Sequence, residues 1–164
     1  MTIAVYAGTF DPVTAGHLSV VRAAAGLFEH LVVVIAVNPA KTTLFTGEER
    51  MALLRDAVAA HPNVRVASTS GYVVELARSI GARVLVRGIR GATDAAFETT
   101  LAQENRKLAP EIETVFVPAL AGLSDVSSSG LKELARASAD LSIHCSPAVA
   151  EALRAKLALR TEST

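Results

Sequence analysis

Short β-branched runs alternate with longer stretches of helical spacing along the chain, and this alternation is the feature that most limits the fold. The run Leu31 to Val37 reads Leu-Val-Val-Val-Ile-Ala-Val, so it is apolar throughout. A strand covered on both faces of a parallel sheet reads in this continuous way, whereas a half-exposed strand alternates apolar and polar residues. Shorter runs of the same kind predict four more strands, at residues 3–6, 64–66, 84–86 and 114–117.

The stretches between these runs predict helices. Leu18, Val21 and Ala25 recur at i, i+3 and i+7, which places them on one helical face. Thr46 is followed three residues later by Glu49, the pattern of a capping box at a helix start. Further helices are expected at residues 73–80, 93–108, 127–137 and 147–159. This order predicts a doubly wound, Rossmann-like α/β fold: a five-stranded parallel sheet with helices on both faces and right-handed crossovers.

Length and charge narrow the class of protein. The 164 residues fit one domain, which we place at residues 1–160, with a frayed tail at residues 161–164. Lys and Arg total 16 and Asp and Glu total 16, so the formal net charge is zero. That balance removes the general attraction to nucleic acid or to an anionic membrane, and we expect neither as a partner. The zero net charge does not exclude a local cluster of basic residues.

Cysteine count and hydropathy bear on location. Cys145 is the single cysteine, which excludes an internal disulfide and a Cys-rich zinc site. The N-terminal segment lacks the basic start of a signal peptide. The longest strongly apolar run, residues 31–37, is far shorter than the ~20 residues of a membrane span. We therefore expect a cytoplasmic location.

The carboxyl end of the first strand carries a string suited to binding an anion. Residues 8–17 read Gly-Thr-Phe-Asp-Pro-Val-Thr-Ala-Gly-His. Gly8 permits close approach of the backbone, and Thr9 offers a hydroxyl. His17 falls in a first helical turn, where free N–H groups and the helix dipole favour an anion and disfavour an imidazolium. An isolated histidine is more often a solvated surface residue, but the complete string favours a phosphate site with His17 as a neutral donor.

This string resembles the nucleotidyltransferase superfamily, whose signature follows the first strand and here reads Thr14-Ala15-Gly16-His17. The resemblance implies attack of an acceptor phosphate on the α-phosphorus of a nucleoside triphosphate, with pyrophosphate leaving and without an enzyme nucleophile. Such a catalyst positions two anions and stabilises charge on phosphorus.

Later segments resemble one family of this superfamily. They are Asn38-Pro39-Ala40-Lys41, Val86-Arg87-Gly88-Ile89-Arg90-Gly91, Phe97-Glu98 with Asn105, and the stretch from Val126 to Ala135 that contains Ser127-Ser128-Ser129. In order and spacing they are similar to the bacterial phosphopantetheine adenylyltransferase family, over residues from the first strand to about 135. The resemblance implies transfer of AMP from ATP to 4′-phosphopantetheine, giving dephospho-coenzyme A and pyrophosphate.

Residue chemistry fits these roles. Lys41 is a flexible point charge, and Arg87 and Arg90 are forked donors suited to bidentate phosphate contacts. The resemblance assigns catalysis to His17, Lys41 and Arg90, with His17 stabilising the transition state. It assigns the acceptor side to Thr9, Lys41, Val73 and Arg87. It assigns ATP to Thr9, Phe10, His17, Gly88, Ile89, Arg90, Glu98, Leu123, Ser124, Asp125, Val126, Ser127, Ser128 and Ser129. Asp11 and Pro12 are expected to shape the loop, and one serine to cap the following helix.

The resemblance also implies Mg²⁺ shielding the triphosphate and a homohexamer, and it raises coenzyme A as a feedback ligand. The sequence holds no carboxylate pair that marks a dedicated metal site, so we expect the ion to be held largely by the nucleotide. His30, His61 and His144 have no spacing for a metal and are expected to be structural or exposed, and Tyr6 is expected in the core.

Several positions depart from the family pattern, namely Ala7, Tyr72, Ala95, Ala96 and Leu123. They keep two alternatives open. The first is the same chemistry on another acceptor, such as nicotinamide mononucleotide or a sugar or alcohol phosphate. The second is a module that binds nucleotide or coenzyme A without turnover. Aromatic residues are 4% of the chain, so adenine is expected to be held mainly by backbone and aliphatic groups.

Overall fold

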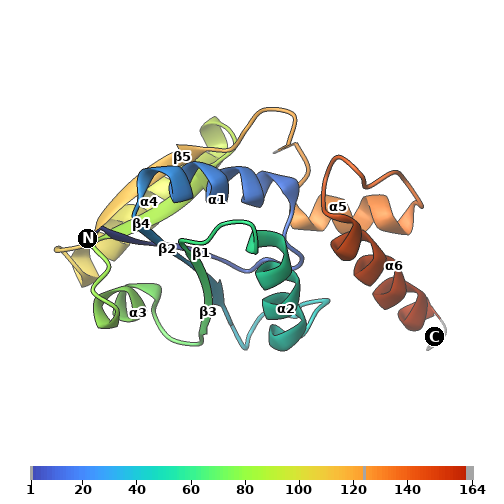
Figure 1. The fold of residues 1–164 in the computed structure, drawn as a ribbon, viewed down its shortest axis with the longest axis horizontal. Helices are drawn as coiled ribbons and strands as arrows, with labels where there is room; N and C mark the ends of the chain where they lie inside the picture. Colours follow the sequence, from blue (N-terminus) through green and yellow to red (C-terminus); the bar gives the residue numbers. More distant parts are fainter. Residues whose placement is uncertain (1, 124, 162–164) are drawn as a thin grey trace.

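The computed structural model describes residues 2–123 and 125–161 and has the predicted α/β architecture (Figure 1). The strands are β1 (Ile3–Gly8), β2 (His30–Ala36), β3 (Val64–Thr69), β4 (Val84–Ile89) and β5 (Glu113–Pro118). The helices are α1 (Ala15–Leu27), α2 (Gly47–Val58), α3 (Val73–Ser79), α4 (Ala92–Leu108), α5 (Ser128–Arg136) and α6 (Pro147–Thr161). Every strand and helix expected from the sequence is present, with ends that differ by a few residues.

The sheet is parallel throughout, and its strand order is β3-β2-β1-β4-β5. The chain therefore builds outward from β1 to β3, crosses back, and continues from β4 on the other side of β1. Between β1 and β4 the direction of winding reverses, and the loops after these two strands diverge. Ligands bind at this point in doubly wound sheets, so the topology alone places the site at the carboxyl ends of β1 and β4.

Burial on both faces explains the continuous apolar runs. In β1, Ala4 and Tyr6 belong to one core while Val5 and Ala7 belong to the other. The first core also takes apolar residues from α1, α2, α5 and α6, and the second takes Val74 and Ala77 of α3. Helices on both faces thus leave no solvent-facing side to the central strands.

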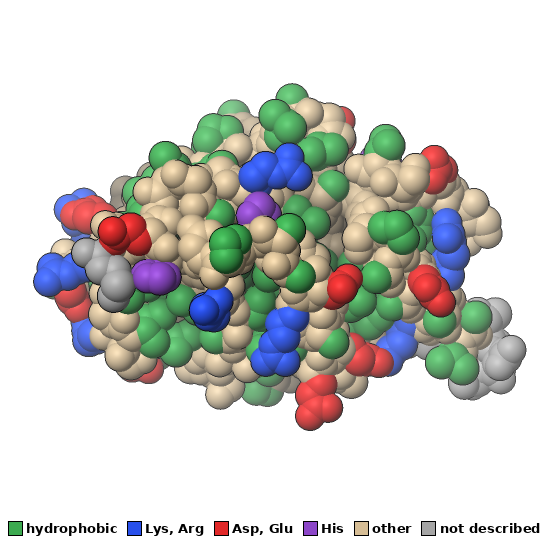
Figure 2. All heavy atoms as spheres, viewed as in Figure 1, with side chains coloured by type: hydrophobic (Ala, Val, Ile, Leu, Met, Phe, Trp, Pro, Cys, Tyr) green, Lys and Arg blue, Asp and Glu red, His purple; other side chains and the backbone are tan. Residues whose placement is uncertain are grey.

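The C-terminal helices α5 and α6 pack together at one end of the molecule (Figure 1). Helix α6 ends at Thr161, the residue at which the sequence places the start of a tail, and residues 162–164 lie outside the described part of the chain. No described helix is long and apolar enough to cross a membrane. On the face seen in Figure 2, acidic and basic side chains are interspersed.

Candidate active site

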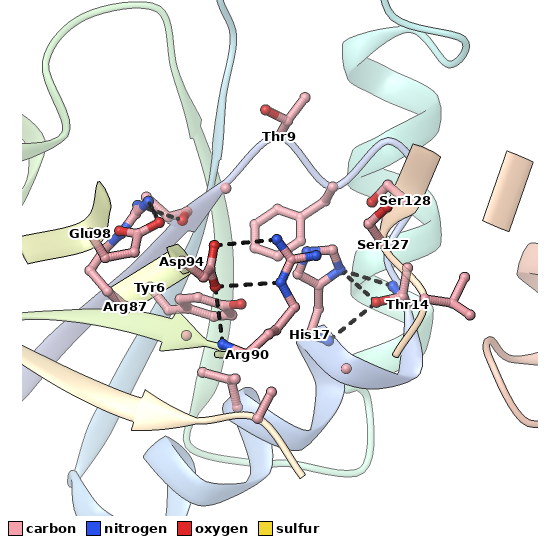
Figure 3. A pocket seen from close by; sticks show the side chains of 18 of the residues that line it. Tyr6, Thr9, Thr14, His17, Arg87, Arg90, Asp94, Glu98, Ser127 and Ser128 are labelled. Atoms are coloured by element: carbon pink, nitrogen blue, oxygen red, sulfur yellow. Dashed lines mark hydrogen bonds and ion pairs between the residues drawn. The ribbon is translucent and has the colours of Figure 1, made fainter. Parts of the chain in front are cut away.

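A cavity of about 300 Å³ opens at the winding reversal predicted by the topology (Figure 3). Its wall comes from the end of β1 and the loop after it, the start of α1, the β4–α4 junction and the start of α5. The lining residues named by the sequence are Thr9, Phe10, His17, Arg87, Gly88, Arg90, Glu98, Val126, Ser127, Ser128 and Ser129. Three segments far apart in the sequence therefore meet at one place.

His17 is held by the residue that caps its own helix. The Thr14 N–H donates to His17 Nδ1 at 3.1 Å, and the His17 N–H donates to Thr14 Oγ1 at 3.3 Å. This is a capping box in which histidine stands where glutamate or glutamine is usual. A backbone N–H can only donate, so Nδ1 accepts and the neutral ring carries its proton on Nε2.

The ring of His17 stays neutral at physiological pH. Its burial, together with the charge of Arg90, lowers the pKa of His17 to about 4. The lowered pKa agrees with the neutral ring expected from the helix position, with burial as the larger cause, and donation from this ring to a phosphate stays a prediction. Nε2–H has no protein hydrogen-bond partner among the residues described, which leaves it available to a ligand in the cavity.

Phe10 packs against the side of His17 away from the cap. Its backbone has φ of 47°, an uncommon value for a bulky residue, and its side chain is only 2% exposed. The Phe10 ring meets His17 edge-on with ring centroids 5.0 Å apart, and meets Tyr6 in the same way at 5.5 Å. A Cβ on Gly8 would lie 3.0 Å from Phe10 Cζ, which is why glycine suits that position.

The two predicted arginines each bind a carboxylate. Arg87 makes a bidentate pair with Glu98, at 2.5 Å from Nε and 2.8 Å from Nη2, and donates through Nη1 to the Ala7 carbonyl at 3.2 Å. Arg90 donates to Asp94 from its backbone N–H at 3.0 Å and from its side chain at 3.3 and 3.4 Å. Both guanidinium groups are thereby aimed along the cavity wall (Figure 3).

The serine residues after β5 have different roles. Ser127 caps α5 by accepting from the Gly130 N–H at 3.1 Å, which confirms the capping role expected of one serine. Ser128 Oγ donates to the Pro12 carbonyl at 2.8 Å, so this hydroxyl joins α5 to the first loop. Ser129 is exposed at the cavity, beside the N-terminus of α5.

Asp11 shapes the loop, as predicted. Its buried carboxylate accepts from the N–H groups of Leu44 and Phe45, each at 2.9 Å, and from Lys132 Nζ at 3.0 Å. Burial alone would raise the pKa of Asp11, but these three donors outweigh it and leave that pKa lowered. One side chain therefore joins the first loop, the segment before α2, and helix α5.

Other predicted residues lie outside the cavity wall. Lys41 is exposed in a turn after β2, closed by a hydrogen bond of 3.0 Å from its N–H to the Asn38 carbonyl. Val73, the first residue of α3, packs against the second core. Ile89, Leu123 and Asp125 do not line the cavity either, and Ser124 lies outside the described residues. Half of the residues assigned to the acceptor therefore line the cavity, compared with most of the residues assigned to ATP.

The structure gives four polar side chains of this region a place that sequence reasoning did not assign to them. Tyr6 is in the core as expected, yet it also lines the cavity. Thr14 was named only as part of a motif. Asp94 was not named as a site residue, although its i+4 spacing from Arg90 was a usable signal. Arg50 is buried beneath the first loop, and its spacing with Leu54 and Val58, the other buried residues of α2, could have shown this.

The comparisons with known proteins agree with this geometry. A family model described as cytidylyltransferase-like matches residues 5–134, which together with the fold and the cavity defines the chain as a nucleotidyltransferase. A phosphopantetheine adenylyltransferase of Desulforudis audaxviator is 46% identical over 162 residues, or 99% of both chains. Another from Herpetosiphon aurantiacus is 45% identical over 99% of both chains. The chain belongs to the phosphopantetheine adenylyltransferase family of enzymes, which serve coenzyme A biosynthesis.

Solved structures support the fold independently. A Vibrio parahaemolyticus protein assigned as a nicotinate-nucleotide adenylyltransferase matches with a TM-score of 0.69 at 15% identity, over 93% of this chain and 99% of that one. A lipopolysaccharide core biosynthesis protein from Thermoplasma volcanium matches with a TM-score of 0.53 at 22% identity, over 73% of this chain and 97% of that one. At these identities the likeness concerns the fold.

Proposed function

We propose that this chain transfers the adenylyl group of ATP to 4′-phosphopantetheine. An acceptor phosphate oxygen forms a bond to the α-phosphorus, the bond from that phosphorus to the bridging oxygen breaks, and pyrophosphate leaves with dephospho-coenzyme A as the second product. The observation that carries the proposal is the free Nε2–H of neutral His17 in one cavity with Arg87, Arg90 and the serine segment. The identity of 44–46% to relatives of that name adds support.

The chain's groups perform this reaction by position and charge. His17 Nε2–H and Arg90 donate to the α-phosphate as negative charge grows on it, and the N-terminus of α5 with Ser129 holds the β- and γ-phosphates. The acceptor is bound by Lys41, Arg87, Thr9 and Val73. Arg87 and Arg90 exchange part of their contact with Glu98 and Asp94 for phosphate oxygens. Cys145 takes no part, because it is buried away from the cavity and burial raises the pKa of its thiol.

Magnesium enters this proposal as part of the substrate MgATP. Among the described residues no group of three His, Cys, Asp or Glu side chains could hold a metal ion. The two carboxylates at the cavity, Asp94 and Glu98, are already engaged by arginines. These residues do not form a metal site, and the phosphate oxygens of ATP are therefore the ligands we assign to the ion.

The direct test is pyrophosphate release by the purified chain with MgATP and 4′-phosphopantetheine. Nicotinamide mononucleotide, nicotinate mononucleotide and glycerol 3-phosphate serve as competing acceptors at the same concentration. We expect release with phosphopantetheine at least 100-fold above the others. Release with another acceptor alone would change the substrate, and tight nucleotide binding by calorimetry without any product would make the chain a binding module.

The same proposal includes assembly, a cytoplasmic location and a regulatory ligand. In α4 only Glu98 is buried, while Phe97 is 67% and Leu108 53% exposed, so this helix presents an apolar surface that a homohexamer would cover.

Coenzyme A contains the phosphopantetheine group and is expected to compete for the acceptor side. Titration of coenzyme A into the pyrophosphate assay measures that competition. Absence of inhibition at millimolar concentration would exclude coenzyme A as a regulatory ligand.

A further inference from the structure

Arg50 is a buried cation beside the first loop. Its side chain belongs to α2 and only 4% of the residue is exposed. Nη1 donates to the Thr9 carbonyl at 2.8 Å, and Nε donates to the Thr46 carbonyl at 3.4 Å. Within residues 2–123 and 125–161, no carboxylate forms an ion pair with Arg50. Carbonyl oxygens alone therefore compensate this charge.

Packing and stability do not account for an arginine at this position. Burial of a charge without an ionic partner is costly, and the first turn of a helix adds the unfavourable positive end of its dipole. The acidic residue Glu49 is one position away, but it binds Lys156 at 2.5 Å and the Thr46 N–H at 2.7 Å. Leu54 and Val58 show that an apolar side chain suits this face of α2. The positive charge and the N–H donors of Arg50 therefore require an explanation other than packing or stability.

The hydrogen bond to Thr9 fixes the orientation of one peptide group. The C=O and N–H of a trans peptide point in opposite directions, so a Thr9 carbonyl aimed at Arg50 directs the Phe10 N–H away from it. Thr9 and Phe10 line the cavity, whereas Arg50 does not. In the part of the chain with described structure, the Phe10 N–H donates to no protein group. The positive φ of Phe10 belongs to the same turn of backbone.

We propose that Arg50 is a positioning residue, which holds the Thr9–Phe10 peptide so that the Phe10 N–H can donate to a phosphate oxygen of the nucleotide, and whose charge, bonded to carbonyl oxygens but without a carboxylate partner, lies behind the loop. This inference rests on the proposed adenylyl transfer. The unpaired charge lies behind the loop on which two anionic substrates meet, so it lowers the electrostatic cost of bringing them together.

The experiment compares Arg50→Met, which removes charge and donors, with Arg50→Lys, which keeps the charge. Arg55→Met is the matched control, because it removes the same charge from an exposed position of the same helix. We expect Arg50→Met to lower kcat by about 100-fold per folded molecule, the scale for loss of one preorganised donor, and to raise the KM for ATP. Arg50→Lys should recover about 10-fold of the lost kcat, and Arg55→Met should match the native chain.

Thermal unfolding, measured on each variant, separates positioning from simple destabilisation. A loss of activity that follows only the folded fraction, with unchanged KM and no recovery in Arg50→Lys, would overturn the proposal. A crystal structure of Arg50→Lys or Arg50→Met gives an answer independent of turnover. The proposal requires the Thr9–Phe10 peptide to rotate in Arg50→Met, and an unchanged peptide would refute it. If the native chain fails to release pyrophosphate, the proposed function fails while this structural result still decides on Arg50.

Discussion

His17 is positioned by the hydrogen bonds of a capping box, and we infer its role from the ring nitrogen that those bonds leave free. Thr14 occupies Nδ1, burial keeps the ring neutral, and Nε2–H remains as the donor. The sequence predicted the neutral state from the helix position of His17. It could not predict the tautomer, because that depends on Nδ1 lying within reach of a particular backbone N–H.

Replacement of His17 by alanine tests this donor. We expect His17→Ala to reduce transition-state stabilisation by roughly 2.7–4 kcal/mol, as for loss of one preorganised donor, with little change in nucleotide affinity. Steady-state kinetics and calorimetry with a non-hydrolysable ATP analogue measure the two quantities. The exposed histidine His30 provides the control His30→Ala. Near-normal turnover in His17→Ala would exclude His17 from the chemistry.

The lowered pKa of His17 also has a consequence for stability. Between a folded pKa of about 4 and an unfolded pKa near 6.5, the unfolded chain binds more protons than the folded chain. The contribution of His17 is therefore fully present above pH 6.5 and is lost as the pH falls toward 4, by up to about 3 kcal/mol in the free energy of unfolding. Urea unfolding from pH 7 to pH 4 should show a smaller loss in His17→Gln than in the native chain. An equal loss of unfolding free energy with falling pH in both proteins would contradict a neutral, buried His17 ring.

At the scale of elements, β4 and α1 are packed so closely that Gly88 has no room for a side chain. A Cβ at this position would lie 2.9 Å from Val20 Cγ2 and 3.4 Å from the Tyr6 hydroxyl. The sequence named Gly88 as a nucleotide contact, and the structure adds that it permits the approach of a strand to a helix. Such an approach cannot be derived from residue order, because it depends on the distance between two elements about 70 residues apart in the chain.

Gly88→Ala is expected to separate β4 from α1. We expect a loss of about 1–3 kcal/mol in the free energy of unfolding, the usual cost of overpacking, and reduced activity because Arg87 and Arg90 move with β4. Urea denaturation and the pyrophosphate assay measure both effects. Gly26→Ala, at a site with nothing within 4 Å, should leave stability unchanged or raise it. Equal stability of the two variants would show that the contact relaxes freely.

At the scale of the whole molecule, the parallel sheet with helices on both faces followed from the apolar runs, whereas the strand order β3-β2-β1-β4-β5 is known only from the structure. The incomplete burial of α4 could not be derived in this way. Its residues follow a helical pattern, but only Glu98 is buried and it binds Arg87 rather than an apolar core. The local pattern predicts a helix, but it does not predict what, if anything, covers the surface of that helix.

The apolar surface of α4 provides a test of assembly. Phe97→Glu places a charge on this surface and should lower the mass measured by light scattering to that of a smaller oligomer or a monomer, without unfolding the chain. Leu27→Glu is the control, because Leu27 is equally exposed, at 68%, on a different helix. An unchanged mass for Phe97→Glu would place any oligomer interface elsewhere.

The capping box at the start of α1 has a consequence for protein engineering. Thr14 and His17 use the same hydrogen bonds to begin a helix and to orient a donor, so folding and chemistry draw on one pair of side chains at this point. Glutamate is the residue that this motif prefers at the position of His17. A redesign guided by stability alone would accept that exchange as an improvement, and the resulting protein would begin α1 correctly while placing an anion where we propose that the phosphate binds.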